Sequence, residues 1–279
     1  MNSKDFSFYK KNGYLVKKNL ISKKTIQKIN TEINKLKKIK NYNFFESKIV
    51  NKKKYLLRLQ DPHLRNRLFL NLSKNKKIID IVAKLMGGTA RFHHSKLNFK
   101  LPSNLGGVIH WHQDWSFYPH TNDDLLAVGI YLEDCSKING PLKVIPKSHK
   151  GKLYDHHLNG NFVGKISEKI NTNKEILLTG TAGTVTFHHV RTIHASGLNL
   201  TENSRPLLLF GYSALDAWPL TYDKGSATDP NNNLSNYDKL ILRGKKTLHP
   251  RITKSPIKIP LPRKSDSIYD LQKSKIKKT

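Results

Sequence analysis

His112 and Asp114 are separated by one residue in the stretch VIHWHQDWSFYPH, which spans residues 108–120. On a β-strand, residues two apart point to the same face, so this imidazole and this carboxylate would converge on one point. Two histidines and one carboxylate form the facial ligand set of non-haem Fe(II) oxygenases, which leaves other coordination positions open. A His-x-Asp pair alone occurs by chance in many proteins. The pair therefore predicts a metal site only if a third ligand lies elsewhere in the chain.

Candidates for the third ligand lie in GTVTFHHVRTIHASGLNLTENSRP, residues 183–206. The residue types alone leave His188, His189 and His194 open as ligands. Arg205 follows in the same stretch. A guanidinium group is planar and grips a carboxylate through two parallel hydrogen bonds, so Arg205 is a candidate binder of an acidic ligand.

Several motifs occur in one order along the chain: WHQD, NGPLKVIPKSHKG and the block H-A-S-G-L-N…R. With them, the sequence from about Lys96 to Pro219 resembles the phytanoyl-CoA dioxygenase family of Fe(II)- and 2-oxoglutarate-dependent oxygenases, which includes ectoine hydroxylase. The resemblance implies a double-stranded β-helix, the jelly roll of cupin-like proteins. It also implies Fe(II) as the metal, with 2-oxoglutarate and O2 as co-substrates. The expected reaction is hydroxylation of a C–H bond with release of succinate and CO2.

The resemblance also implies roles for individual residues. The catalytic iron ligands that it implies are His112, Asp114 and His194. Arg205 matches the arginine that binds the distal carboxylate of 2-oxoglutarate, and Ser196 resembles the hydroxyl that assists this arginine. Asn98 is similar to the residue that contacts the other end of the co-substrate.

The remaining histidines of these segments have structural roles as alternatives to a role in the site. His110 lies on the same strand face as His112 and is either a second-layer group or simply packed or solvated. His188 and His189 occupy positions that are variable or structural in the family. His149, in PKSHKG, resembles a loop-fixing residue, and Lys147 replaces a glycine that is common in that turn.

Residues that contact the substrate are harder to predict. The candidates are Trp115, Tyr118, His94 and Tyr212. The aromatic rings among them would face a cationic amine or an apolar chain, or would belong to the core. Lys96 and Arg191 would favour an anionic head group or would be surface charges. We expect a small zwitterion such as a 2-aminoethylphosphonate-type organophosphonate. Ectoine, a quaternary amine and an acyl-CoA are the alternatives.

Composition limits the other classes of function. The 279 residues carry a formal net charge of +30, spread as lysines among many Asn and Ile residues rather than gathered on one element. This distribution favours compositional drift over a nucleic-acid surface, although a nucleic-acid-modifying oxygenase and a non-catalytic 2-oxoglutarate-binding protein stay open. The single cysteine, Cys135, excludes an intrachain disulfide. No secretory signal and no apolar run of roughly 18 residues is present, so we expect a cytoplasmic protein, a monomer or homodimer, without membrane contact.

The elements that must position these residues follow from periodicity. Ser3 begins a short helix that Gly13 stops, and a strand follows. Ile26, Ile29, Ile33 and Leu36 predict an amphipathic helix with Ser22 as its N-cap, and residues 75–88 predict another. From residue 89 onward, short β-type runs with turn residues predict a mainly β fold with flanking α-helices. We expect one domain over residues 1–279: helices to about 90, the jelly roll from about 90 to 220, and a basic extended segment over 221–279.

Overall fold

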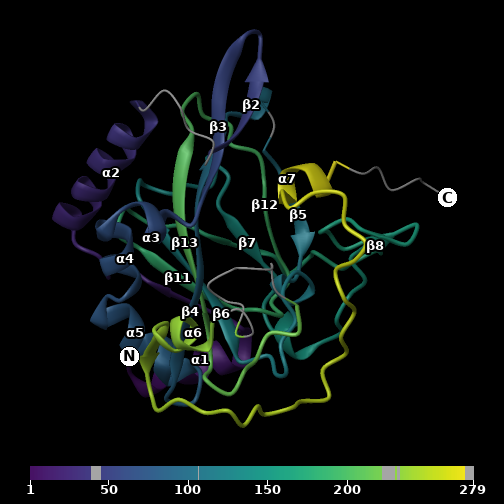
Figure 1. The fold of residues 1–279 in the computed structure, drawn as a ribbon. Coiled ribbons are helices and arrows are strands. Elements are labelled where there is room, and N and C mark those ends of the chain that lie inside the picture. The colour runs from purple at the N-terminus through teal and green to yellow at the C-terminus, as the bar shows by residue number, and fades with distance from the viewer. Residues whose placement is uncertain (39–44, 106, 222–229, 231–232, 274–279) are drawn as a thin grey trace.

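The computed structural model describes residues 1–38, 45–105, 107–221, 230 and 233–273. Two antiparallel sheets form a jelly-roll core, and helices flank it (Figure 1). The fold class predicted from the sequence, mainly β with flanking α-helices, is confirmed.

The larger sheet supplies one wall of the core. In the described part of the chain its spatial order is β1 (Tyr14–Lys17), β11 (Val185–His189), β6 (Leu125–Tyr131), β13 (Arg205–Ser213), β4 (Ala90–Lys100), β3 (Lys53–Gln60) and β2 (Phe45–Val50), with β14 (Ile241–Arg243) also paired to β4. Every residue of the central strand β6 is buried. A strand that is covered on both faces reads as a continuous apolar run, as LLAVGIY does.

The smaller sheet supplies the opposite wall. Its described strands are β10 (Ile176–Leu178), β7 (Leu142–Val144), β12 (His194–Ser196) and β5 (Ile109–His112), in that spatial order, and β8 (His157–Leu158) pairs separately with β9 (Asn161–Phe162). The 3₁₀ turns are η1 (Ser103–Leu105), η2 (Asp114–Ser116) and η3 (Ser148–Lys150). The strand β5 lies at one edge of this sheet, and the turn η2 follows it within the WHQD motif.

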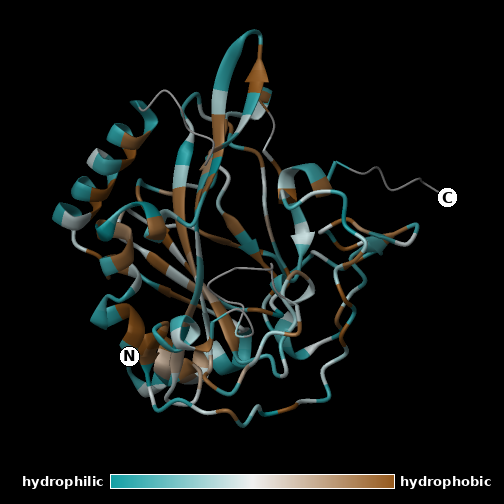
Figure 2. Ribbon diagram, in the orientation of Figure 1, coloured by the Kyte–Doolittle hydropathy of each residue, from teal (hydrophilic) through white to brown (hydrophobic). Residues whose placement is uncertain are grey.

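Helices cover the outer side of the larger sheet (Figure 1). They are α1 (Ser3–Asn12), α2 (Lys23–Lys38), α3 (Pro62–Arg65), α4 (Arg67–Ser73) and α5 (Lys76–Leu85). The four apolar residues predicted for α2 are buried, and the Ser22 hydroxyl accepts from the Thr25 amide at 3.2 Å, as an N-cap does. Gly13 ends α1 with φ 80°. Hydrophobic residues on the helices and on the central strands therefore form one layered core (Figure 2).

One part of the N-terminal region differs from the expectation of helices. Strands β2 and β3 form an antiparallel hairpin that extends the larger sheet. The turn residues Asn51 and Lys52 both have positive φ, 47° and 62°, which matches the right-handed twist of a two-residue hairpin. The sequence signal was weak because a lysine occupies the position where such turns commonly carry glycine.

The C-terminal segment runs along the surface and returns to the core (Figure 1). It contains α6 (Leu234–Asp238), the strand β14 and α7 (Ile268–Leu271). Between β14 and α7 it is held at intervals: the Trp115 indole donates to the Pro256 carbonyl at 3.2 Å, and the His157 ring donates to the Ile259 carbonyl at 3.1 Å. Among the described residues, no helix combines the length and the apolar character needed to cross a membrane.

Candidate active site

The three residues expected to bind iron meet between neighbouring strands of the smaller sheet. His194 of β12 is the register partner of His112 of β5. The Asp114 Oδ1 atom lies 3.8 Å from the His112 Nε2 atom and 3.7 Å from the His194 Nε2 atom. One ligand atom from each residue lies within 4.8 Å of the others. Of the three candidate histidines, His194 is the one that forms this group with His112 and Asp114.

The histidine rings are oriented for metal binding. The Nδ1 atom of His112 donates to the carbonyl of His110 at 2.8 Å, and that of His194 donates to the carbonyl of Thr192 at 2.9 Å. Because Nδ1 carries the proton, the lone pair of each ring is on Nε2, the atom that faces Asp114. Burial lowers the pKa of His112 well below its usual value and that of His194 to about 4, so both rings are neutral at pH 7.

The donor set fits ferrous iron. Burial alone would raise the pKa of Asp114, but His194 and His188 beside it bring that pKa well below its usual value. Asp114 is therefore an anionic carboxylate. Two neutral imidazole nitrogens and one carboxylate oxygen are the ligands that non-haem Fe(II) oxygenases use.

The local route to this geometry differs from the predicted strand. We expected His112 and Asp114 on one strand face, but β5 ends at His112 and Asp114 begins the turn η2. Gln113 between them is fully buried, and its side-chain amide donates to the carbonyl of Arg191 at 2.8 Å and accepts from the amide of Tyr154 at 2.9 Å. These bonds fix the turn, so the carboxylate returns to the imidazole without continuing the strand.

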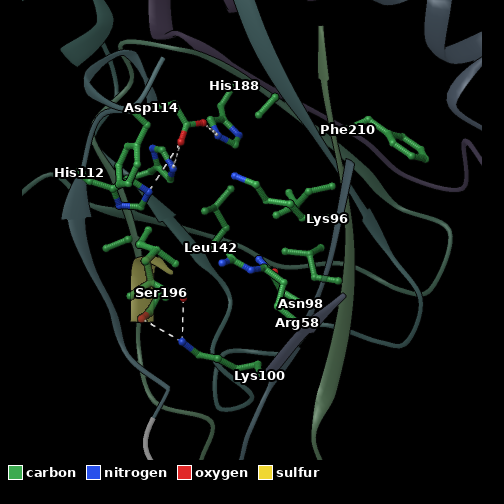
Figure 3. A pocket seen from close by; sticks show the side chains of 18 of the residues that line it. Arg58, Lys96, Asn98, Lys100, His112, Asp114, Leu142, His188, Ser196 and Phe210 are labelled. Atoms are coloured by element: carbon green, nitrogen blue, oxygen red, sulfur yellow. Dashed lines mark hydrogen bonds and ion pairs between the residues drawn. The ribbon is translucent and has the colours of Figure 1, made fainter. Parts of the chain in front are cut away.

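A cavity of about 160 Å³ extends from this cluster through the core. Strand β4 lines it with alternate residues, which point to one face of the sheet: His94, Lys96, Asn98 and Lys100. Asp114 and His188 lie at one end of the cavity, and Ser196 and Lys100 lie at the other (Figure 3). The cavity thus connects the predicted iron ligands with the predicted co-substrate residues.

Arg205 is held by backbone carbonyls at the end of the cavity away from Asp114. Its Nε atom donates to the carbonyl of Asn139 at 3.0 Å, and its Nη2 atom donates to that of Gly140 at 2.8 Å. The Nη1 atom is buried and has no hydrogen-bond partner in the described structure. A buried guanidinium with one unused donor beside a cavity fits a carboxylate ligand, because such a donor otherwise loses its hydration without compensation.

Ser196 and Asn98 line the same cavity. The Ser196 Oγ atom accepts from the Lys100 ammonium at 2.8 Å, and Asn98 Oδ1 is buried without a partner among the described atoms. Burial, followed by the charge of Arg205, lowers the pKa of Lys100 to about 7. Lys100 was not among the site residues predicted from the sequence. The alternation of β4, already visible as H-S-K-L-N-F-K, was the signal that places it beside Asn98.

His188 also belongs to the cavity, although its sequence position suggested a structural residue. Its Nε2 atom lies 3.5 Å from Asp114 Oδ2, and its ring centroid is 4.5 Å from that of His194. Neither ring nitrogen has a hydrogen-bond partner within the described residues. Thr186, two positions earlier on β11, also lines the cavity. The alternation of side chains along this strand was therefore the sequence signal that could have placed His188 in the cavity. His189 points the other way and packs against His149, with ring centroids 5.4 Å apart.

Two of the four predicted substrate residues reach the cavity. His94 and Tyr118 line it and pack edge to face, with ring centroids 5.3 Å apart. Trp115 and Tyr212 do not line it. The Trp115 indole is directed to the C-terminal segment, and the Tyr212 hydroxyl donates to the carbonyl of Ser73 at 2.8 Å within the core. Packing of Trp115 and Tyr212 between the sheets and the segments that cover them directs both side chains away from the cavity.

Lys147, which departs from the family pattern in its turn, also has an unusual backbone conformation. Lys147, which stands where a glycine is common, has φ 68°. This left-handed conformation is strained for a side chain other than glycine. The His110 side chain is exposed, and its backbone carbonyl accepts from the Nδ1 atom of His112.

A jelly roll that brings two histidines, a carboxylate and a buried arginine to one cavity defines the class of Fe(II)- and 2-oxoglutarate-dependent dioxygenases. Residues 9–207 match the phytanoyl-CoA dioxygenase family, and the chain belongs to this family. It is an enzyme that uses Fe(II), 2-oxoglutarate and O2.

Individual relatives agree with this assignment. The chain is 41% identical over 239 residues to a probable alpha-ketoglutarate-dependent hypophosphite dioxygenase of Stutzerimonas stutzeri, which covers 82% of this chain and 80% of that protein. It is 29% identical over 174 residues to the ectoine dioxygenase of Stutzerimonas stutzeri strain A1501, covering 55% of this chain and 57% of that protein. The human peroxisomal phytanoyl-CoA dioxygenase is 27% identical over 229 residues, or 75% of this chain and 67% of that protein.

Solved structures share the fold. EctD from S. alaskensis with bound Fe superimposes with a TM-score of 0.64 at 19% identity, covering 77% of each chain. The epimerase SnoN, in complex with Fe3+, alpha ketoglutarate and nogalamycin RO, has a TM-score of 0.64 at 18% identity and covers 80% of this chain and 87% of that chain.

Proposed function

We propose that this dioxygenase oxidises a small phosphorus oxyanion. A 2-aminoethylphosphonate-type organophosphonate, hydroxylated at a C–H bond, and hypophosphite, oxidised at a P–H bond, are the two substrates to test first. The observation that carries the proposal is the positive charge of the cavity. The 41% identity to a probable hypophosphite dioxygenase supports it.

The charge of the cavity favours an anion. The charged residues among its described lining are the cations Arg58, Lys96, Lys100 and Arg205 and the carboxylates Asp114 and Asp266. Arg58 pairs with Glu46 and Asp266 pairs with Arg263, so Lys96, Arg205 and Asp114, together with Lys100 when it is protonated, set the charge of the cavity. A ferrous ion and the 2-oxoglutarate dianion cancel each other, so this excess of positive charge remains for the substrate. Opposite charges attract more strongly in a cavity that is shielded from water than at the surface, so this excess favours an anionic ligand. A quaternary amine would add a further cation to the same cavity.

The size of the cavity favours a small molecule. Its volume of about 160 Å³ is similar to that of a cavity that holds one benzene-sized ligand, roughly 150 Å³. 2-Oxoglutarate must occupy part of this space. The space left beside it favours a compact oxyanion over an acyl-CoA chain, which would need a much larger rearrangement of the walls.

Lys96 is the residue we assign to the substrate anion. It extends from β4 toward the end of the cavity that holds Asp114 and His188 (Figure 3). An ammonium group at that end attracts a phosphonate or phosphinate and holds it near the metal ligands. Its charge would act on the substrate, whereas Arg205 acts on the co-substrate.

The proposed co-substrate site lies at the opposite end. There Arg205 Nη1 and the Ser196 hydroxyl hold the distal carboxylate of 2-oxoglutarate, and Asn98 contacts its other end. Lys100 adds a second cation beside Ser196. Donors held by backbone carbonyls do not reorganise on binding, which favours a fixed orientation of the co-substrate.

His112, Asp114 and His194 would hold the ferrous ion, and Tyr118 and His94 would form the wall beside it. The bound ion supplies dioxygen activation coupled to decarboxylation of 2-oxoglutarate, so that one oxygen atom enters succinate and the other enters the substrate. The protein's contribution is to orient both small molecules along one cavity and to keep bulk water out.

Other assignments from the sequence stay predictions. Ectoine and quaternary amines, acyl-CoA substrates, a non-catalytic 2-oxoglutarate-binding role and a nucleic-acid-modifying role are the alternatives. The cytoplasmic location and the monomeric or homodimeric state also stay predictions. A nucleic-acid role predicts binding that weakens steeply with salt, which distinguishes it from the proposal.

The test loads the purified protein anaerobically with Fe(II) and 2-oxoglutarate and then admits oxygen. Succinate is measured with 2-aminoethylphosphonate, hypophosphite, ectoine, choline and an acyl-CoA as separate additions. We expect succinate that depends on a phosphorus compound. Lys96→Met is expected to raise KM for that compound more than KM for 2-oxoglutarate. Succinate stimulated by ectoine, choline or acyl-CoA, and by neither phosphorus compound, would contradict the proposal.

A further inference from the structure

The C-terminal segment closes one side of the cavity. We call residues 265–273 the C-terminal cap; it includes α7. Asp266, Ile268 and Tyr269 of the cap line the cavity together with residues of the two sheets. In Figure 1 the cap lies beside β5, the edge of the smaller sheet, and near β2, the edge of the larger sheet. The two sheets are not joined to each other along this side, so the cap supplies a wall that the jelly roll itself lacks.

Polar contacts attach the cap to the larger sheet. The Ser267 hydroxyl donates to the Glu46 carboxylate of β2. The same carboxylate forms an ion pair with Arg58 of β3, with 2.7 Å between Arg58 Nη2 and Glu46 Oε2. The Arg58 guanidinium lies 5.9 Å from the centre of the Tyr269 ring. Arg58 itself is only 4% exposed and lines the cavity, so the contact between cap and sheet continues into the cavity.

Gln272 attaches the cap to the smaller sheet. Its side-chain carbonyl accepts from the amide of His110 on β5 at 2.8 Å, and its side-chain amide donates to the carbonyl of Gly164 at 2.6 Å. The Lys165 ammonium donates to the backbone carbonyl of Gln272 at 2.8 Å. An edge strand has unpaired backbone groups, and here one glutamine side chain takes the place of a neighbouring strand. The glutamine is buried, so these bonds are shielded from competing water.

The inner and outer sides of the cap differ in character. Leu271 and Gln272 are buried, and Tyr269 is partly buried with its ring toward Arg58, whereas Asp270 and Lys273 are exposed and pair with each other. The inner side is therefore built to pack on the cavity. The exposed pair gives a control that changes the same segment without changing the wall.

We propose that Tyr269 is a specificity-determining residue that sets the upper size limit of the substrate, with Gln272 holding the cap in place. The proposal rests on the proposed function, because it concerns the size of a phosphorus oxyanion. Tyr269 lies beside Arg58, whose register partner is Asn98, so its ring borders the cavity between the two ends and occupies space that a larger substituent on phosphorus would need. Removal of the ring opens that space, and release of the cap opens the same side of the cavity.

The test compares Tyr269→Ala, Tyr269→Phe, Gln272→Ala and the control Lys273→Ala. Turnover of 2-aminoethylphosphonate and of benzylphosphonate is measured with each protein. Tyr269→Ala is expected to raise the ratio of kcat/KM for benzylphosphonate over 2-aminoethylphosphonate by roughly 10-fold or more. Tyr269→Phe keeps the size of the ring, and Lys273→Ala leaves Tyr269 unchanged. Both variants should therefore keep the parent ratio.

A second readout follows the cap directly. Gln272→Ala is expected to speed tryptic cleavage at Arg263 or Lys264, which flank the cap, and to broaden the substrate range as Tyr269→Ala does. Faster cleavage with an unchanged range would overturn the proposal, as would an unchanged ratio in Tyr269→Ala. A gain of activity with 2-oxoadipate in place of 2-oxoglutarate, without a gain for benzylphosphonate, would also overturn it, since the cap would then border the co-substrate.

Failure of the proposed function is recognised separately. If the parent enzyme turns over no phosphorus compound, the cap is tested by calorimetry on protein loaded with Mn(II) and 2-oxoglutarate, with inorganic phosphate and benzylphosphonate as the probes. A Tyr269→Ala variant that gains affinity for benzylphosphonate relative to phosphate supports the cap as a size limit. An equal ratio in parent and variant contradicts it.

Discussion

His194 and His112 are register partners on adjacent antiparallel strands, and their ring centroids lie 4.1 Å apart. They are separated by eighty-two positions in the sequence, and strand pairing alone brings them together. Because successive residues alternate between sheet faces, a slip of one residue would direct one ring away from the cavity. The register of β5 against β12 is thus the structural basis of the metal site.

Removal of a ligand should abolish metal binding. Asp114→Ala and His194→Ala are each expected to lose iron and to show no substrate-dependent succinate, because two remaining ligands hold a ferrous ion weakly. Iron content after reconstitution and succinate formation measure the effect, and circular dichroism checks the fold. The matched control is His110→Ala, an exposed histidine on the same strand, which should retain both. Full turnover in Asp114→Ala would show that the ligand assignment is wrong.

Arg205 should act on the co-substrate. A charge-assisted hydrogen bond contributes about 1.5–3 kcal/mol, so Arg205→Ala is expected to raise KM for 2-oxoglutarate roughly 10- to 100-fold. Arg205→Lys should recover only part of the loss, since an ammonium lacks the planar pair of donors. Steady-state kinetics with varied 2-oxoglutarate gives the answer. Arg243→Ala, at an exposed position on β14, is the control. An unchanged KM in Arg205→Ala would remove this residue from the co-substrate site.

Lys100 should make stability depend on pH. Its pKa is lowered from 10.5 to about 7 in the folded protein by burial and by Arg205. Between about pH 7 and 10.5 the unfolded chain holds a proton that folded Lys100 has lost, so this group's contribution to stability rises with pH. Below pH 7 the folded protein bears the full penalty of the buried charge. Lys100→Met should therefore increase the free energy of unfolding more at pH 6 than at pH 9, measured by urea denaturation.

The same lysine should link co-substrate binding to protons. A 2-oxoglutarate carboxylate near Ser196 favours the charged form of Lys100, so binding above pH 7 should take up a proton. Calorimetry on Mn(II)-loaded protein at pH 8, in buffers of different ionisation enthalpy, measures this uptake. Lys100→Met should abolish it. Equal proton uptake in parent and variant would place the titrating group elsewhere.

Tyr212 should affect stability rather than catalysis. Its hydroxyl donates to the Ser73 carbonyl in the core, away from the cavity. Tyr212→Phe leaves that buried carbonyl without this donor and is expected to lower the free energy of unfolding by about 1 kcal/mol, with KM and kcat unchanged. Tyr118→Phe, at the cavity, is the comparison in which kinetics should change. A kinetic effect of Tyr212→Phe at parent stability would restore Tyr212 as a substrate residue.

Lys147 offers a test of backbone strain. Its φ of 68° is strained for a lysine, and glycine adopts it freely. Lys147→Gly is expected to raise the free energy of unfolding by about 0.5–1 kcal/mol, the relief of strain being partly offset by the greater entropy of the unfolded chain. Urea denaturation measures the change. Lys150→Gly, three residues later in the 3₁₀ turn, is the control that should not stabilise.

Local patterns in the sequence determined the elements and the chemical types. The apolar spacing of α2, the stop at Gly13 and the β-type runs all appear in the structure as predicted, because each depends on interactions between near neighbours. The His-x-Asp pair and the later histidine and arginine pointed to iron and a keto acid because few chemistries require those residue types together.

Only the tertiary structure decided which side chains meet. It placed His194 beside His112 through strand register, brought His188 and Lys100 into the cavity, and turned Trp115 and Tyr212 away from it. It also folded the C-terminal cap against two sheet edges that are far from it in sequence. These outcomes depend on packing and hydrogen bonds between distant segments, which no short window of sequence contains. The chemistry was therefore encoded locally, whereas the shape and charge of the cavity emerge from long-range contacts.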